Sequence, residues 1–164
     1  KILNKRVLGI GIARHDLIHM ASAFFASPFE ESAILSIDGF GDFTSTMIGV
    51  GKGDKIEVLD NVIYPHSVGV FYTAFTQYLG FEHYGDEYKV MGLSPYGKPT
   101  LVDKVKDVLI FKSNGLFEIN KKYFKHPKEG VSMSWEGGVI RLLKISFLII
   151  WLKFLARRDQ KMKK

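Results

Sequence analysis

Residues 15–26 read His-Asp-Leu-Ile-His-Met-Ala-Ser-Ala-Phe-Phe-Ala and favour a helix. Because side chains four positions apart lie on one face of a helix, His15 and His19 are close enough to hold one metal ion. An apolar strand pattern, Ala33 to Ile37, follows and ends at Asp38. Two histidines and one carboxylate make a candidate 2-His-1-carboxylate site, the arrangement associated with iron(II) among other metals. The spacing alone also fits two hydrogen-bonded histidines on a half-buried helix.

The rest of the chain alternates between strand and helix patterns, which predicts an α/β fold. Strands are expected at residues 7–12, 33–37, 44–50, 55–63 and 116–119. Helices are expected at residues 67–79 and 100–111, with Ser67 as the N-cap of the first and a hairpin turn at 51–54. With 164 residues, 46% of them apolar, the chain is long enough for about one domain with a core.

Net charge and cysteine content limit the classes of partner. The formal net charge is +6, but residues 141–164 carry eight Lys or Arg against the single Asp159, so the basic character is mostly a property of the tail. No RNA-binding aromatic motif or basic recognition helix accompanies it, and no nucleic-acid partner is predicted. The absence of cysteine excludes disulfides and thiolate metal sites and fits a reducing cytoplasm, the expected location.

Four motifs occur in a fixed order along residues 7–137. They are the histidine segment at 15–25, Leu35-Ser-Ile-Asp38-Gly39-Phe-Gly41-Asp42, Tyr64-Pro-His66-Ser-Val-Gly69-Val-Phe-Tyr72 and Gly85-Asp-Glu87-Tyr-Lys89-Val-Met-Gly92-Leu-Ser-Pro-Tyr-Gly97. Together they resemble the carbamoyltransferase family, which includes the O-carbamoylating enzymes of nodulation-factor and antibiotic biosynthesis. The resemblance implies that residues 1–137 are part of that family's amino-terminal domain, with a partial actin-like or sugar-kinase-like ATPase (ASKHA) fold.

The resemblance also implies a ligand set for a divalent metal. His15, His19 and Asp38 match the family's metal-binding residues, and the implied ion is iron(II), with zinc as the alternative. It would act as a Lewis acid on the phosphate or carbonyl oxygen of a carbamoyl-adenylate intermediate. A further carboxylate ligand of the family is missing from this chain. Asp16 replaces the second histidine of the family's usual His-His pair, and Asp42 stands where Glu is usual.

The segment Asp38-Gly39-Phe40-Gly41-Asp42 allows a second chemistry. Glycines after a strand let backbone N–H groups approach a phosphate closely, although such a sequence also fits a simple turn. In the implied ATPase fold, loops of this kind surround nucleotide phosphates. Gly39, Gly41 and Asp42 are therefore predicted to bind the nucleotide, ATP or carbamoyl-adenylate.

Lys89 and Glu87 are the predicted catalytic residues. Without the resemblance, they fit a surface salt bridge that leads into a loop. With it, Lys89 is expected to contact nucleotide phosphate or to stabilise developing negative charge, and Glu87 to position Lys89. Among the other histidines, His66 is expected to cap the following helix or line a pocket, whereas His83 and His126 are expected to be solvated.

The full enzyme implied by the resemblance would make carbamoyl-adenylate from carbamoyl phosphate and ATP. It would then transfer the carbamoyl group to the hydroxyl of a small-molecule acceptor. This chain is expected to be a fragment that does not turn over alone and needs the remaining part of the enzyme as a partner chain. Two alternatives stay open: a non-catalytic metal- or nucleotide-binding module, and an actin-like ATPase that phosphorylates an acceptor without needing carbamoyl phosphate.

Residues 138–164 form a basic, apolar tail that does not match the family. Its longest charge-free apolar run, Ile145 to Leu152, is shorter than the roughly 20 residues of a membrane-spanning helix. An interfacial helix in contact with a membrane and a partner-binding segment are two interpretations. The third, which we favour, is a change of reading frame near Gly137 that leaves a non-native tail.

Overall fold

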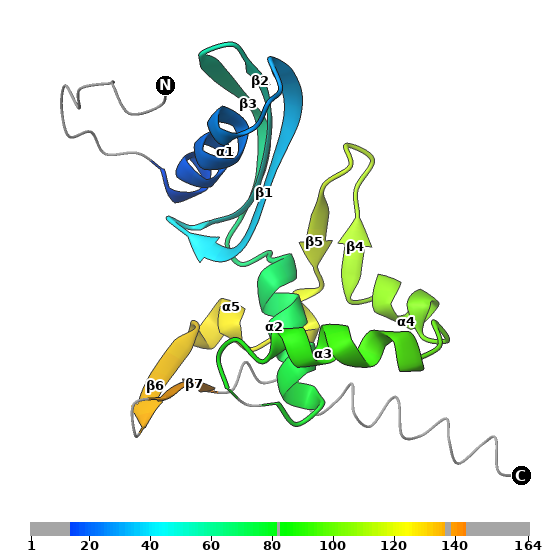
Figure 1. The fold of residues 1–164 in the computed structure, drawn as a ribbon. Helices are drawn as coiled ribbons and strands as arrows, with labels where there is room; N and C mark the ends of the chain where they lie inside the picture. Colours follow the sequence, from blue (N-terminus) through cyan, green and yellow to red (C-terminus); the bar gives the residue numbers. More distant parts are fainter. Residues whose placement is uncertain (1–13, 82, 137–138, 144–164) are drawn as a thin grey trace, which may run out of the picture.

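A computed structural model describes residues 14–81, 83–136 and 139–143 of the chain (Figure 1). It begins with helix α1 (His15–Ala26), followed by strands β1 (Glu31–Gly41), β2 (Thr44–Lys52) and β3 (Lys55–Ile63). The three strands form an antiparallel sheet in the order β1-β2-β3, and α1 lies against one face of it (Figure 1).

The first core lies between α1 and this sheet. Met20 and Phe24 of the helix pack against Ile34 of β1 and Met47 of β2, and all four side chains are buried. Because successive strand residues point to opposite faces, Ile34 and Ser36 are buried beneath α1 whereas their neighbours along β1 are exposed. The helix and β1 are thus held face to face by apolar contact.

The remaining elements form a second group around helix α2 (Val68–Tyr78). Its core contains Val70, Ala74, Val108, Ile119 and Phe124. The other elements are α3 (Glu87–Leu93), a 3-10 turn (Ser94–Tyr96), α4 (Val102–Lys106), β4 (Leu109–Phe111), β5 (Phe117–Ile119), a 3-10 turn (Lys121–Tyr123), α5 (His126–Glu129), β6 (Ser132–Glu136) and β7 (Val139–Leu143). Strands β4 and β5 pair antiparallel, as do β6 and β7.

The expected α/β class is confirmed as a mixed α/β structure with small antiparallel sheets. The N-cap prediction is also confirmed, because the Ser67 hydroxyl accepts a hydrogen bond from the Val70 N–H at 3.0 Å. The helix predicted over residues 100–111 is confirmed only for α4, which ends at Lys106, and is wrong for Leu109–Phe111, which form β4. Pairing of β4 with β5 overrides the helical pattern there. The strand predicted at residues 7–12 lies outside the described residues, and the actin-like fold stays a prediction.

Two paired strands lie on either side of the predicted boundary at residue 138. Strand β7 pairs with β6, and this pairing joins residues on both sides of that boundary. The predictions for the tail beyond Leu143 fall outside the described residues. Within the described part of the chain, none of the helices combines the length and the hydropathy needed to cross a membrane.

Candidate metal centre

The turn between β1 and β2 fixes the start of α1. Asp42 and Phe43 have φ angles of 50° and 66° and form the two central residues of this hairpin turn. The side chain of Asp42 accepts a hydrogen bond from the backbone N–H of His15 at 2.9 Å. Because the first N–H groups of a helix lack intrahelical partners, this carboxylate caps α1 from a neighbouring element. The contact places His15 beside the end of β1.

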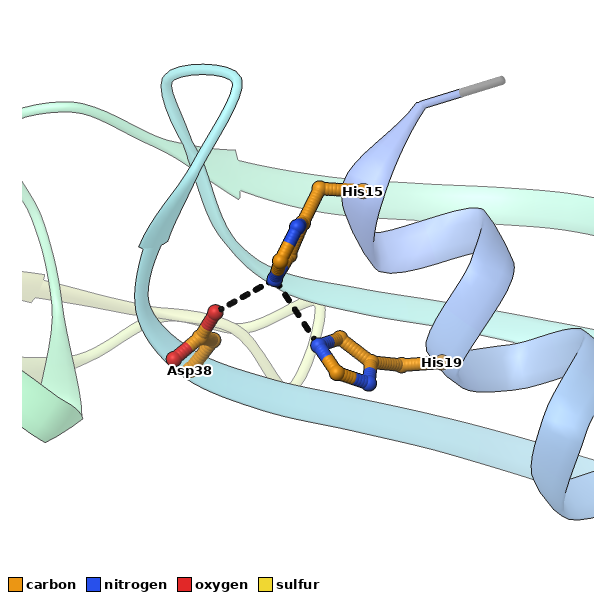
Figure 2. A group of neighbouring side chains, drawn as sticks. All are labelled: His15, His19 and Asp38. Atoms are coloured by element: carbon orange, nitrogen blue, oxygen red, sulfur yellow. Dashed lines mark hydrogen bonds and ion pairs between the residues drawn. The ribbon is translucent and has the colours of Figure 1, made fainter.

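His15, His19 and Asp38 converge on one point between α1 and β1 (Figure 2). The Nε2 atom of His15 lies 3.1 Å from Oδ2 of Asp38 and 2.9 Å from Nε2 of His19. One ligand atom from each residue lies within 4.8 Å of the others. Both histidines are exposed and Asp38 is half-buried, so the cluster opens to solvent.

The donor set and its spacing fit a divalent metal ion. Two ligand atoms that each lie about 2.1 Å from an ion, at a right angle, are about 3.0 Å apart. The two separations from His15 Nε2, 2.9 and 3.1 Å, are close to this value. Two imidazoles and one carboxylate are ligands that both iron(II) and zinc accept, and three protein ligands leave coordination positions for a substrate.

The backbone around Asp38 is held by the start of α2. Oδ1 of Asp38 accepts a hydrogen bond from the Gly39 N–H at 2.6 Å, which leaves Oδ2 facing His15. The Ser67 hydroxyl donates to the Gly39 carbonyl at 2.7 Å. A Cβ at Gly69 would lie 2.8 Å from the Asp38 carbonyl oxygen, so α2 packs closely here. Ser67 and Gly69 were missed as supporting residues, although they belong to the third sequence motif.

The glycines predicted to form a phosphate-binding loop belong to a strand instead. β1 continues as far as Gly41, so the loop prediction for Gly39 and Gly41 is wrong. A Cβ at Gly41 would lie 2.2 Å from the His15 ring, which shows that this glycine makes room for the imidazole. Asp42 acts as the helix cap described above. A nucleotide-binding role for these three residues stays a prediction.

Lys89 and Glu87 do not form the expected pair. Nζ of Lys89 lies 2.6 Å from Oδ1 of Asp86, whereas Glu87 accepts a hydrogen bond from the Thr73 hydroxyl of α2 at 2.6 Å. Because residues two positions apart on a helix do not face each other, Glu87 cannot position Lys89 by direct contact. The sequence prediction missed Asp86, although residues three positions apart, such as Asp86 and Lys89, are neighbours on a helix.

The ion pair changes the pKa values of both partners. The hydrogen bond from Lys89 lowers the pKa of the Asp86 carboxyl, and the same bond raises the pKa of Lys89. Asp86 is buried and also accepts a hydrogen bond from the His83 backbone N–H at 3.1 Å. The Asp86 side chain therefore ties the loop before α3 to Lys89, which remains charged.

The prediction that His126 is solvated is wrong. Its side chain is 1% exposed, and its Nε2 donates to the Pro65 carbonyl at 2.8 Å. Rings of Phe40, Tyr64 and Phe124 surround it, and burial lowers its pKa.

The other two histidines differ in their surroundings. Nδ1 of His66 accepts a hydrogen bond from the Ile119 N–H at 3.1 Å, so His66 braces β5 rather than capping α2, and burial lowers its pKa. His83 is exposed, as predicted.

Comparison with known proteins identifies one family across most of the chain. Residues 2–138 match the family model described as "Carbamoyltransferase N-terminus". The matched segment contains all of the residues discussed above, from His15 to His126.

Three relatives place this match within longer proteins. The chain is 44% identical over 121 residues to the uncharacterized protein sll1178 of Synechocystis, covering 73% of this chain and 20% of that protein. It is 47% identical over 90 residues to the nodulation protein NolNO of Sinorhizobium fredii, covering 55% and 13% respectively. Nodulation protein NolO of Bradyrhizobium diazoefficiens is 47% identical over 85 residues, covering 52% and 15%. The chain thus spans a fifth or less of the length of these relatives.

Proposed function

Because the chain belongs to the carbamoyltransferase N-terminus family, we propose that it supplies the metal-binding part of an enzyme that transfers a carbamoyl group to an acceptor hydroxyl. The observation that carries this proposal is the convergence of His15, His19 and Asp38. The substrates of the complete enzyme are carbamoyl phosphate, ATP and a small molecule with a hydroxyl group, with carbamoyl-adenylate as the activated intermediate.

In this proposal, His15 and His19 bind iron(II), or zinc in its place, through Nε2, and Asp38 binds it through Oδ2. The ion would supply Lewis-acid polarisation of a phosphate or carbonyl oxygen of the carbamoyl substrate. The protein holds the three ligands in place before the ion arrives: Asp42 fixes the start of α1, and Ser67 fixes the backbone next to Asp38. Ligands held in this way need little rearrangement on binding.

Lys89 has a separate role in the proposal. Its ammonium group pairs with Asp86 and lies 5.7 Å from the centre of the Phe81 ring. We infer that Lys89 reaches the nucleotide phosphates only if it exchanges this carboxylate for a phosphate oxygen. Substitution of Lys89 by Gln should therefore weaken ATP binding without changing metal content.

The residues of this sequence correspond to only part of the length of the relatives. They cover a fifth or less of those proteins. We propose that the remaining ligands and the acceptor pocket lie in the rest of the enzyme, which a partner polypeptide can supply. The second candidate function is a metal-binding module without turnover of its own, and the cluster of His15, His19 and Asp38 favours it. The enzyme role predicts that a partner polypeptide restores carbamoyl transfer, and the module role predicts that it does not.

The first test is metal content after anaerobic purification. The parent should contain close to one equivalent of iron(II) or zinc, and His15→Ala and His19→Ala should each lose it. His83→Ala is the matched control, because His83 is also an exposed histidine but lies outside the cluster. A well-folded parent without metal, or metal retained in both cluster variants, would contradict the metal-binding role.

The second test addresses the formation of carbamoyl-adenylate, the step that precedes carbamoyl transfer. The chain would be mixed with a copy of the NolNO region that follows the 90 matched residues, and carbamoyl-phosphate-dependent exchange of pyrophosphate into ATP would be measured. Exchange that requires both polypeptides and His15 supports the enzyme role. Metal binding without exchange favours the module, and phosphorylation of an acceptor without carbamoyl phosphate favours the ATPase alternative.

A further inference from the structure

A buried polar contact joins α1 to β1 directly behind the metal cluster. The hydroxyl of Ser36 donates a hydrogen bond to Oδ1 of Asp16 at 3.1 Å. The two residues are 6% and 1% exposed, and they lie beside the apolar core of Met20, Ile34 and Met47. Asp16 follows His15 on the helix, and Ser36 precedes Asp38 by two residues on the strand. The polar pair and the metal ligands therefore belong to the same two elements.

We propose that Asp16 and Ser36 are positioning residues, whose hydrogen bond sets the register of α1 on β1 and so brings His15 to Asp38. This inference rests on the metal-binding role proposed above. Neither residue touches the candidate ion; both act through the position of the helix.

The energetics of the pair argue against a purely stabilising role. The second carboxyl oxygen of Asp16, Oδ2, is buried without a hydrogen-bond partner among the described residues. Burial of an unsatisfied polar atom costs free energy, and an apolar residue at such a position is often neutral or stabilising. The carboxyl group of Asp16 therefore contributes little to stability. Its directional hydrogen bond to Ser36, which holds the helix in one position on the strand, better explains its presence.

The register of α1 on β1 matters because the three ligand atoms must lie close together to bind one ion. Besides the bond from the His15 N–H to Asp42, α1 contacts the sheet through Met20 and Phe24, whose apolar contacts are less directional than a hydrogen bond. A shift of two residues along β1 would move Asp38 by roughly 6.6 Å relative to His15. The observed Nε2 to Oδ2 distance is 3.1 Å, so such a shift would separate the two ligands. The directional hydrogen bond between Ser36 and Asp16 opposes such a shift from within the core, in addition to the Asp42 bond at the end of the helix.

The test compares four variants of the full chain. Ser36→Ala and Asp16→Leu remove the hydrogen bond, whereas Asp16→Asn keeps an acceptor oxygen for Ser36. Ser32→Ala is the matched control, because Ser32 lies on the same face of β1, four residues before Ser36. Affinity for cobalt(II), whose visible spectrum reports coordination geometry, should fall about 10- to 100-fold in Ser36→Ala and Asp16→Leu. Asp16→Asn and Ser32→Ala should bind within about threefold of the parent, with the parent spectrum.

A metal-free measurement separates this inference from the proposed function. The side-chain nitrogen shifts of His15, observed by NMR without metal, should change in Ser36→Ala and Asp16→Leu but not in Asp16→Asn. Urea unfolding confirms that each variant is folded. If the parent binds no cobalt, the proposed metal-binding function fails. The His15 nitrogen shifts then decide by themselves whether Asp16 and Ser36 position His15. Parent-like His15 shifts in folded Ser36→Ala, or parent-like cobalt affinity in that variant, would overturn the inference.

Discussion

At the scale of single residues, Gly41 determines where the His15 ring can lie. An added Cβ at Gly41 would meet the ring at 2.2 Å, whereas a Cβ at Gly39 would meet nothing within 4 Å. We expect Gly41→Ala to displace the imidazole from Asp38 and to weaken metal binding at least about tenfold. Gly39→Ala is the matched control and should bind metal like the parent. Titration with zinc in competition with a chromophoric chelator measures the metal affinity of both variants. Equal affinities would show that Gly41 does not determine the position of the His15 ring.

His126 gives the fold a dependence on pH. Burial lowers its pKa and that of His66 below their usual value. Below about pH 6.5 the unfolded state therefore binds more protons than the folded state, and the free energy of unfolding should fall as the pH is lowered from 6.5 toward 5. Above that range both states are neutral at these positions, and no change is expected from them.

Urea unfolding of the metal-free chain at pH 7 and pH 5.5 measures this effect. The loss of stability between the two values should be smaller in His126→Gln than in the parent. A parent whose unfolding free energy is the same at both pH values would show that burial of these histidines does not control acid stability.

At the scale of elements, the start of α2 links the second core to the metal cluster. The Ser67 hydroxyl is fully buried, caps α2 by accepting from Val70, and donates to Gly39 beside Asp38. Removing both bonds in Ser67→Ala should lower the free energy of unfolding by about 1–3 kcal/mol. Metal affinity should also fall, because the backbone next to Asp38 loses its support.

Urea unfolding and metal titration of Ser67→Ala test this link. Ser94→Ala is a suitable control, since Ser94 is exposed and its hydroxyl donates to a carbonyl within its own helical segment. The control should change stability by less than about 0.5 kcal/mol. If Ser67→Ala lowers stability but leaves metal affinity unchanged, the cap supports α2 alone and not the cluster.

At the scale of the whole molecule, the sheet presents an apolar surface on the side opposite α1. Leu35 and Ile37 of β1 are 61% and 55% exposed, although their neighbours Ile34 and Ser36 are buried. Because β1 is also an edge strand of the described sheet, this surface favours association between chains. We expect the chain to self-associate as its concentration rises.

Sedimentation velocity over a range of concentrations measures that association. Leu35→Lys should raise the monomer fraction without lowering thermal stability, because the lysine replaces an exposed side chain. Phe43→Asn is the control, because Phe43 is 77% exposed but belongs to the turn between β1 and β2 and not to the surface formed by Leu35 and Ile37. Equal association of the parent and Leu35→Lys would show that this face does not drive it.

Local sequence patterns determined the features that depend on near neighbours. The spacing of His15 and His19 places both rings on one helical face, and Ser67 caps the helix that follows it. The order of the motifs also predicted the family to which the chain belongs. By contrast, the i to i+2 spacing of Glu87 and Lys89 already argued against the pair that we predicted between them.

Tertiary structure alone decided the contacts between residues far apart in the chain. Asp38 meets His15 only because β1 packs under α1, and His126 is buried because the rings of Phe40 and Tyr64, from two distant segments, join that of Phe124 around it. Residues 109–111 form a strand rather than the end of a helix because β5 supplies a pairing partner. Such contacts depend on how whole elements pack, and the periodicity of a single segment carries no information about its neighbour in space.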